Sequence, residues 1–255
     1  MKIGLKLWSS NDFYIDLALS LFEDDIFNYI ELFIEPDSLG FIDLWRSVDI
    51  PFVLHAPHSM TGLNPADADC EVRNFDLIQQ VDEYRKALDP KYIIFHPGVD
   101  GDIKETIRQF CGIRSRFAGI HKCMLVENKP LKGLNGERCI GFAPAEIERI
   151  THACDIGICL DFGHALAAAN SLGVPSEIIL EEFRWQDPAI YHLSDGDVSA
   201  EIDSHWNLGR GSYPIAEFID TLPEDASITL ETAKAEKDNL DDFINDTKYI
   251  GRLIK

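Results

Sequence analysis

Eight short runs rich in β-branched and aromatic residues alternate with segments of helical periodicity. The runs cover 2–8, 29–33, 52–55, 92–96, 123–127, 157–161, 189–192 and 227–231. Strands that alternate with helices are typical of parallel βα units, and eight units in 255 residues fit a closed barrel better than an open sheet. The pattern predicts an α/β fold, a single (β/α)8 TIM barrel. No shift in composition marks a second domain, so we expect one TIM-barrel domain over residues 1–255.

Apolar residues at helical spacing place helices between the runs. The expected helices are 13–25, 39–48, 70–88, 103–117, 144–154, 165–172, 176–183, 215–221 and 240–254. The second run also holds an acidic residue, Glu31, within an apolar sequence. Because a buried carboxylate is costly unless it is paired, Glu31 is expected to face the barrel interior near the site or to meet a cation.

Acidic residues outnumber basic ones by 44 to 23, which gives a formal net charge of −21. A field of that sign repels a polyanion unless it is locally reversed. The charge weighs against tight nonspecific DNA binding and leaves a local nucleic-acid site open. No apolar run approaches the ~20 residues of a membrane span, and the first residues enter a strand pattern without a signal-peptide core. We expect no membrane partner and a soluble, cytoplasmic protein.

The stretch from Tyr191 to Gly211 concentrates residues that bind metals. It holds His192, Asp203 and His205 within fourteen residues and ends in a glycine-rich turn. If the backbone around Asp203 and His205 is extended, both side chains point the same way. Neutral imidazole and carboxylate are ligands that zinc, manganese and iron favour. A polar surface loop is the alternative for this stretch taken alone.

Further ligand-type residues occupy the ends of the expected strands. Six of the eight histidines lie at or just beyond a strand end: His55, His58, His96, His164, His192 and His205. Glu127, Asp161 and Glu231 each end an apolar run. All strand carboxyl ends of a parallel barrel open on one face, so these side chains are expected to converge there. Carboxylates would not crowd at that face without cations to offset their repulsion, which predicts a metal site.

Short motifs at these strand ends resemble, in order, those of the endonuclease IV group (AP endonuclease family 2) in the xylose-isomerase-like TIM-barrel superfamily. The motifs are HAPH at 55–58, HPG at 96–98, EN at 127–128, LDFGH at 160–164, HLSD at 192–195, DSHWNLGRG at 203–211 and LET at 230–232. The resemblance implies a metal-dependent phosphodiesterase. Its reaction would be hydrolysis of the phosphodiester 5′ to an abasic site in DNA by a metal-bound hydroxide.

The same resemblance implies three metal ions, zinc, with manganese or iron as other options, held by nine side chains. The three ligand groups are His55, His96 and Glu127; Glu127, Asp161, His192 and Glu231; and His164, Asp203 and His205. In this scheme Glu127 bridges two ions and positions the hydroxide. Arg210 and Lys129 are candidate phosphate contacts. His58 is a third candidate substrate-binding residue and stands where the endonucleases would have an aromatic side chain.

A sugar isomerase, epimerase or dehydratase of the same superfamily is the second hypothesis. The residues of the middle group also match the single-metal site of those enzymes, in which Glu127 and Glu231 would be the catalytic acid and base groups. A small neutral sugar suits the acidic chain better than DNA as a partner. A degenerate barrel kept as a binding module is a third hypothesis, and the complete set of nine ligand-type residues argues against it.

Overall fold

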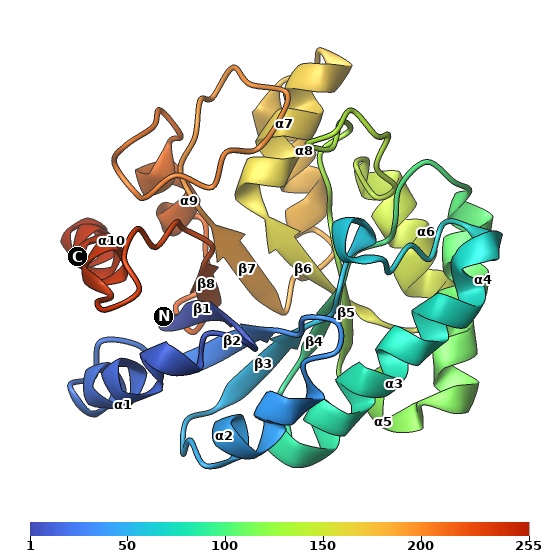
Figure 1. Cartoon of the computed structure of the whole chain (residues 1–255). Helices are drawn as coiled ribbons and strands as arrows, with labels where there is room; N and C mark the ends of the chain where they lie inside the picture. Colours follow the sequence, from blue (N-terminus) through green and yellow to red (C-terminus); the bar gives the residue numbers. More distant parts are fainter. Residues whose placement is uncertain (255) are drawn as a thin grey trace.

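The eight runs form parallel strands that pair in chain order, and β1 pairs with β8 to close the barrel. The computed structural model describes residues 1–254, and Figure 1 shows the strands at its centre with helices around them. The strands are β1 (Lys2–Trp8), β2 (Tyr29–Phe33), β3 (Phe52–His55), β4 (Ile93–Phe95), β5 (Met124–Glu127), β6 (Gly157–Asp161), β7 (Ile190–Leu193) and β8 (Ser227–Leu230). The prediction of a (β/α)8 barrel is confirmed.

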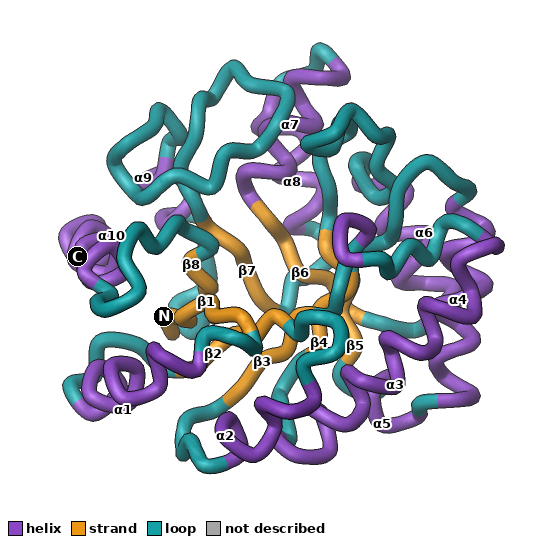
Figure 2. The backbone as a smooth tube through the Cα atoms, in the orientation of Figure 1, coloured by secondary structure: helices purple, strands orange, loops and turns teal. Residues whose placement is uncertain are grey.

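Helices occupy the connections between strands, and Figure 2 shows them as an outer ring joined to the barrel by loops. They are α1 (Ile15–Glu23), α2 (Ile42–Arg46), α3 (Glu71–Leu88), α4 (Ile103–Arg116), α5 (Ala118–His121), α6 (Pro144–Cys154), α7 (Phe162–Leu172), α8 (Ser176–Arg184), α9 (Ile215–Asp220) and α10 (Asp241–Leu253). The short helix α5 was not expected from the sequence. Among residues 1–254, no helix combines the length and apolar character that crossing a membrane requires.

Helix α7 begins at Phe162, earlier than the expected start at residue 165. One oxygen of the Asp161 side chain accepts a hydrogen bond from the backbone N–H of His164 at 2.7 Å, which caps the first turn of the helix. Asp161 therefore ends strand β6 and also begins α7. This double role fixes its carboxylate at the carboxyl end of the barrel.

A layer of apolar side chains fills the half of the barrel nearest the amino ends of the strands. Alternate residues of a strand share one face, and the inward-facing residues of this layer pack as one cluster. Its buried members are Tyr29, Val53, Ile94, Leu125, Cys159 and Ile190. On β1 the corresponding residue is Gly4, where a Cβ would lie only 2.4 Å from the Tyr29 ring. Because this layer fills the amino-terminal half, the next inward-facing residue of each strand lies at the carboxyl end of the barrel.

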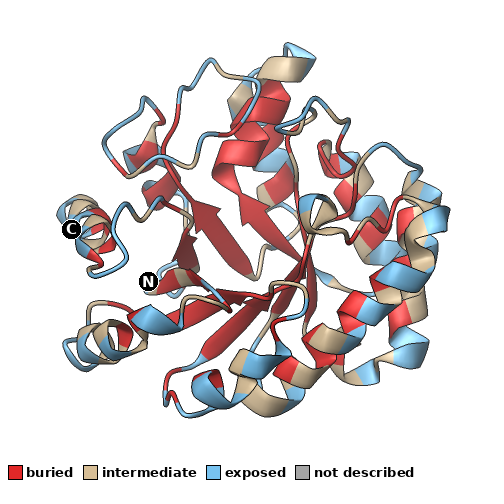
Figure 3. Cartoon of the chain, in the orientation of Figure 1, coloured by how far each residue is buried: buried red, intermediate tan, exposed pale blue. Residues whose placement is uncertain are grey.

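The outward faces of the strands pack against the helices and form the larger core. Figure 3 shows that the strands are buried while the helices expose their outer faces. In α10, Phe243 is fully buried, and its ring meets that of Phe27 edge to face with centroids 5.9 Å apart. The last helix is thereby tied to the segment that leads into β2.

We expect Phe243→Ala to lower the free energy of unfolding by about 3–5 kcal/mol, because the change leaves a cavity in the core. Urea denaturation followed by circular dichroism measures this loss. The matched control is Asn245→Ala, an exposed position of the same helix, which should change stability by less than about 0.5 kcal/mol. Equal effects of the two substitutions would show that α10 does not depend on this contact.

Candidate metal centre

Polar and charged side chains follow the apolar layer at the carboxyl ends of the strands. On six strands the residue two positions beyond the apolar layer, on the same face, is ionisable: Glu31, His55, His96, Glu127, Asp161 and His192. Five of these six are buried, and His96 is mostly so. Glu231 lies immediately after β8. The convergence expected from the strand-end pattern is therefore present at this end of the barrel.

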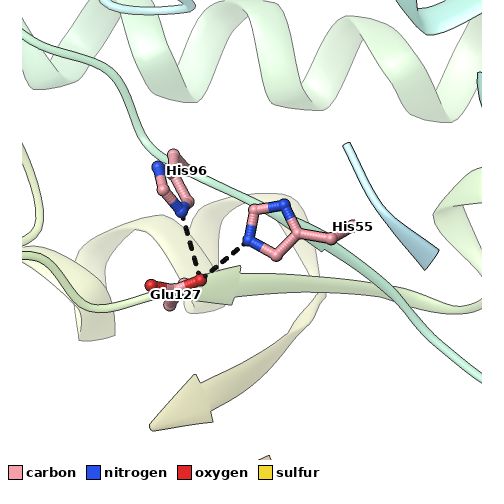
Figure 4. Close-up of side chains that lie close together, drawn as sticks. All are labelled: His55, His96 and Glu127. Carbon is pink, nitrogen blue, oxygen red and sulfur yellow. Dashed lines mark hydrogen bonds and ion pairs between the residues drawn. The ribbon is translucent and has the colours of Figure 1, made fainter. Parts of the chain in front are cut away.

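The first group comprises His55, His96 and Glu127. The two Nε2 atoms lie 3.1 and 3.2 Å from the same oxygen, Oε2 of Glu127, and Figure 4 shows both rings directed at it. The Nδ1 of His55 lies 2.9 Å from the carbonyl oxygen of Ala56 and donates to it in the neutral ring. The Nε2 lone pair then faces a carboxylate oxygen, an arrangement that a cation between them would stabilise.

The inner group is centred on His192 and three carboxylates. The Nε2 of His192 lies 3.0 Å from Oε2 of Glu31, and a donated proton there leaves the lone pair on Nδ1. That Nδ1 lies 3.2 Å from Glu231 Oε1, 3.5 Å from Glu127 Oε2 and 4.0 Å from Asp161 Oδ2. The inner group thus offers one nitrogen and three carboxylate ligands around one point.

Cys159 also approaches the inner group, beside Glu127 and His192, although the sequence had not singled it out. Burial raises the pKa of its thiol to about 12. Its place in the apolar layer accounts for its burial.

The third group comprises His164, Asp203 and His205. The Nδ1 atoms of the two histidines lie 3.0 and 3.1 Å from the carbonyl oxygens of Asn128 and Glu231. Each ring therefore directs its Nε2 towards Asp203 Oδ2, at 3.7 Å from His164 and 3.3 Å from His205. The structure thus brings the three side chains together.

The backbone that joins Asp203 to His205 is not extended, so that expectation was wrong. His205 has a φ of 49°, in the left-handed region. Oδ1 of Asp203 accepts a hydrogen bond from the backbone N–H of Ser204 at 2.7 Å, and such short-range bonds favour a turn over a strand. The turn brings the His205 ring back over Asp203, so the ligands meet by a different route.

Three buried polar atoms test whether these residues suit a metal. The Nδ1 of His192 and the Oδ2 atoms of Asp161 and Asp203 have no hydrogen-bond partner among residues 1–254. An unsatisfied buried polar group costs about 1–3 kcal/mol. Each of the three atoms belongs to the inner or the third group and faces other ligand-type atoms. Imidazole nitrogen with carboxylate oxygen suits zinc, manganese or iron, so the donor set fits a divalent metal.

The electrostatics also favour positive charge in the inner group. Burial raises the pKa of Asp161 to about 6, and the neighbouring carboxylate of Asp203 adds to the shift against the opposing charge of His164. Burial alone would lower the pKa of His192, but the nearby thiol and carboxylates hold it well above its usual value. Both shifts mean that a proton or a metal ion is strongly stabilised between these side chains.

Two lysines also enter the centre. Lys6 of β1, which the sequence analysis did not single out, lies 2.5 Å from Oε1 of both Glu31 and Glu231. The expectation for Glu31 is confirmed on both counts, because it faces the barrel interior and meets this cation. Lys129 lies 3.2 Å from Glu127 Oε1. The sequence does contain a feature that could have identified Lys6, because it is a lysine at an inward-facing position of a strand with alternating polarity.

The centre opens into a cavity of about 590 Å³. Two of the candidate substrate-binding residues, Lys129 and His58, line it, and the His58 ring stacks on His96 with centroids 5.2 Å apart. Arg210 is exposed and is not among the residues that line this cavity. The turn that carries Arg210 is organised around Asp195, whose Oδ2 accepts hydrogen bonds from the two flanking glycine N–H groups at 2.9 Å.

We expect Gly163→Ala to weaken zinc binding at the third group by about 10–100-fold, the range for changes around a metal ligand. A Cβ at Gly163 would lie 2.8 Å from Asp203 Oδ1 and 2.9 Å from its Oδ2, so the carboxylate must move. Isothermal titration calorimetry with Zn²⁺ measures the change. Gly40→Ala is the control, since a Cβ at Gly40 has open space. If the weaker zinc binding at the third group were unchanged in Gly163→Ala, the result would count against Asp203 as a ligand.

Comparison with known proteins gives one family match. The model of the family described as "Xylose isomerase-like TIM barrel" matches residues 43–245. A curated relative, "Probable endonuclease 4" from Thermoplasma volcanium, is 28% identical over 190 residues, which cover 69% of this chain and 65% of the relative. The chain therefore matches less than two thirds of the length of that relative.

Solved structures share the whole fold at lower identity. Endonuclease IV from Thermus thermophilus superposes with a TM-score of 0.73 at 18% identity, covering 100% of this chain and 99% of that one. A D-tagatose 3-epimerase-like protein gives a TM-score of 0.73 at 20% identity, with coverage of 100% and 97%. At such identities the likeness shows the fold alone, and the two names denote different reactions.

Proposed function

The chain belongs to the xylose isomerase-like TIM barrel family, and we propose that it is a divalent-metal-dependent hydrolase that cleaves a phosphodiester bond. The observation that carries the proposal is the set of three ligand groups that adjoin one carboxylate, Glu127. A single-metal isomerase would need only the inner group. The complete first and third groups therefore favour a multinuclear, hydrolytic centre, and the curated relative named probable endonuclease 4 supports the same class.

The residues that would hold the ions are those of the three groups. Divalent ions in such a centre supply an activated water and offset negative charge on a phosphoryl oxygen. The chain itself orients the ligands through hydrogen bonds to the ring nitrogens that do not face the ions. Backbone carbonyls accept from Nδ1 of His55, His164 and His205, and Glu31 accepts from Nε2 of His192. These hydrogen bonds fix the ring orientation before substrate arrives, so little reorganisation is needed in the reaction.

The walls of the cavity suit an anionic substrate. Four lysines line it, although the chain as a whole carries a net charge of −21: Lys6, Lys129, Lys234 and Lys237. Burial lowers the pKa of Lys234 to about 8, so this group remains mostly charged at neutral pH. A cavity of about 590 Å³ is within the size range of small-molecule sites. It would accept one sugar-phosphate unit of a nucleic acid more readily than a paired duplex.

A sugar isomerase or epimerase is the second candidate, and one observation favours it. In the inner group Glu127 and Glu231 face the same nitrogen, Nδ1 of His192, so both carboxylates would flank a substrate bound at one ion. Such a pair can transfer a proton between neighbouring carbons. The D-tagatose 3-epimerase-like neighbour shares the fold, which is consistent with this chemistry.

Parallel assays separate the two candidates. Abasic duplex DNA and a panel of ketoses and aldoses are incubated with equal amounts of enzyme, with zinc and with manganese. We expect cleavage on the 5′ side of the abasic site with a 3′-hydroxyl product, inhibition by EDTA and a steep loss of binding with salt. Epimerised sugar together with uncut DNA would refute the phosphodiesterase and establish the second candidate.

Substitution of the shared carboxylate tests the centre under either reaction. We expect Glu127→Gln to lower kcat/KM by more than about 100-fold, because the neutral amide removes a ligand from the ions and a charge from the substrate site. Steady-state kinetics on the active substrate measures the loss. Glu181→Gln, at an exposed position of α8, is the control and should retain normal turnover. Normal turnover in Glu127→Gln would place the active site elsewhere.

A further inference from the structure

Lys129 is positioned where a metal ion would otherwise interact with two of the ligand groups. Its Nζ lies 3.2 Å from Nε2 of His96, 3.3 Å from Nε2 of His164 and 3.2 Å from Oε1 of Glu127. We propose that the Lys129 ammonium is a built-in cation of the centre. It contacts one histidine of the first group and one of the third, so it competes with ions at those two groups, and the inner group is left as the one site of tight binding in the resting protein. This inference rests on the metal centre of the proposed function.

The lone pairs of the two histidines explain why Lys129 and a metal exclude each other. A neutral imidazole has one nitrogen that donates and one that accepts. The Nδ1 of His164 lies 3.0 Å from the Asn128 carbonyl oxygen and 2.9 Å from Glu127 Oε1, so in the neutral ring the proton is on Nδ1, and Nε2 accepts from Lys129. In His96 the Nε2 that faces Glu127 is also the atom that Lys129 contacts. A metal ion bound to either Nε2 would therefore have to displace the ammonium.

The position of Lys129 is fixed by the chain around it. Its backbone N–H donates to the carbonyl of Gly141 at 3.0 Å, and Pro130 follows directly. Only 12% of its side chain is exposed. The lysine thus belongs to the wall of the centre and is not a mobile surface group.

The charge of the buried residues agrees with one bound ion. With neutral histidines, five carboxylates carry −5 and two ammonium groups carry +2, which leaves −3. The residues counted are Glu31, Glu127, Asp161, Asp203, Glu231, Lys6 and Lys129. One divalent ion brings the total to −1, whereas three would bring it to +3. Excess positive charge is unfavourable in a site of low dielectric, so the ammonium weakens the binding of ions beyond the first.

The inner group is the one that Lys129 leaves available. The Nδ1 of His192 and the Oδ2 of Asp161 have no hydrogen-bond partner among residues 1–254. Lys6 contacts Glu231 but none of the histidine nitrogens. We therefore assign the tight site to the inner group and weak, lysine-limited binding to the first and third groups.

The number of bound ions in Lys129→Met tests this inference. Methionine keeps the length and most of the volume of the side chain and removes the charge. Protein stripped with a chelator is titrated with Zn²⁺ alone in a calorimeter, and metal content is measured by mass spectrometry after gel filtration. We expect one tightly bound zinc per chain in the native protein and at least two in Lys129→Met. Lys132→Met, a half-exposed lysine of the same loop paired with Glu201, is the control and should bind as the native protein does.

Two further variants guard against misfolding and misassignment. Lys129→Gln should show the same gain, and thermal unfolding of each apo-protein checks that the fold persists. Adding His164→Ala to Lys129→Met should reduce the gain, because it removes a ligand that the lysine had blocked.

The possible outcomes separate the two proposals. Equal zinc content in the native protein and Lys129→Met, or less in the variant, overturns the role of Lys129 and leaves the metal-dependent function standing. Absence of tight zinc in both proteins overturns the metal centre itself, and with it both proposals.

Discussion

The rest of the centre is arranged around one buried charge, the carboxylate of Glu127. It is fully buried at the end of β5, and a charge in that position is stable only when positive or donor groups surround it. Burial by itself would raise the pKa of Glu127, but Lys129 and the surrounding histidines hold it well below the usual value. Histidines from four other strand ends approach this carboxylate within 3.5 Å, so the side chains at the barrel mouth are arranged to compensate one charge.

Much of this arrangement could be predicted from the sequence, because strand geometry carries it. Side chains two apart on a strand share a face, so Leu125 in the apolar layer places Glu127 directly above it, and Ile190 does the same for His192. All strands of a parallel barrel end on one face, so residues far apart in the chain meet without any knowledge of the loops. Fold and ligand convergence both follow from these two periodic rules.

What could not be predicted depends on loops and on long side chains. The left-handed turn at His205 arises from hydrogen bonds of Asp203 to its own backbone, and no strand rule describes it. The ammonium groups of Lys6 and Lys129 lie several bonds from their backbones, so their sequence positions alone do not show which carboxylates they meet. The role of Gly163 also cannot be inferred from the sequence. It depends on the missing Cβ, whose absence leaves room for the Asp203 carboxylate.

The overall negative charge and the four lysines that line the cavity have opposite effects on an anionic substrate. The −21 charge acts on a molecule outside the protein, where salt screens it beyond about 8 Å. Inside the cavity, the lysines lie much closer to a bound anion than a screening length, and burial weakens the screening further. A long polyanion must bring many phosphates against the acidic exterior to place one of them in the cavity. A substrate with a single phosphate unit within reach gains the local attraction without that repulsion. If DNA is the substrate, its attraction to the protein must therefore come from a few contacts around one distorted nucleotide and not from the length of the duplex.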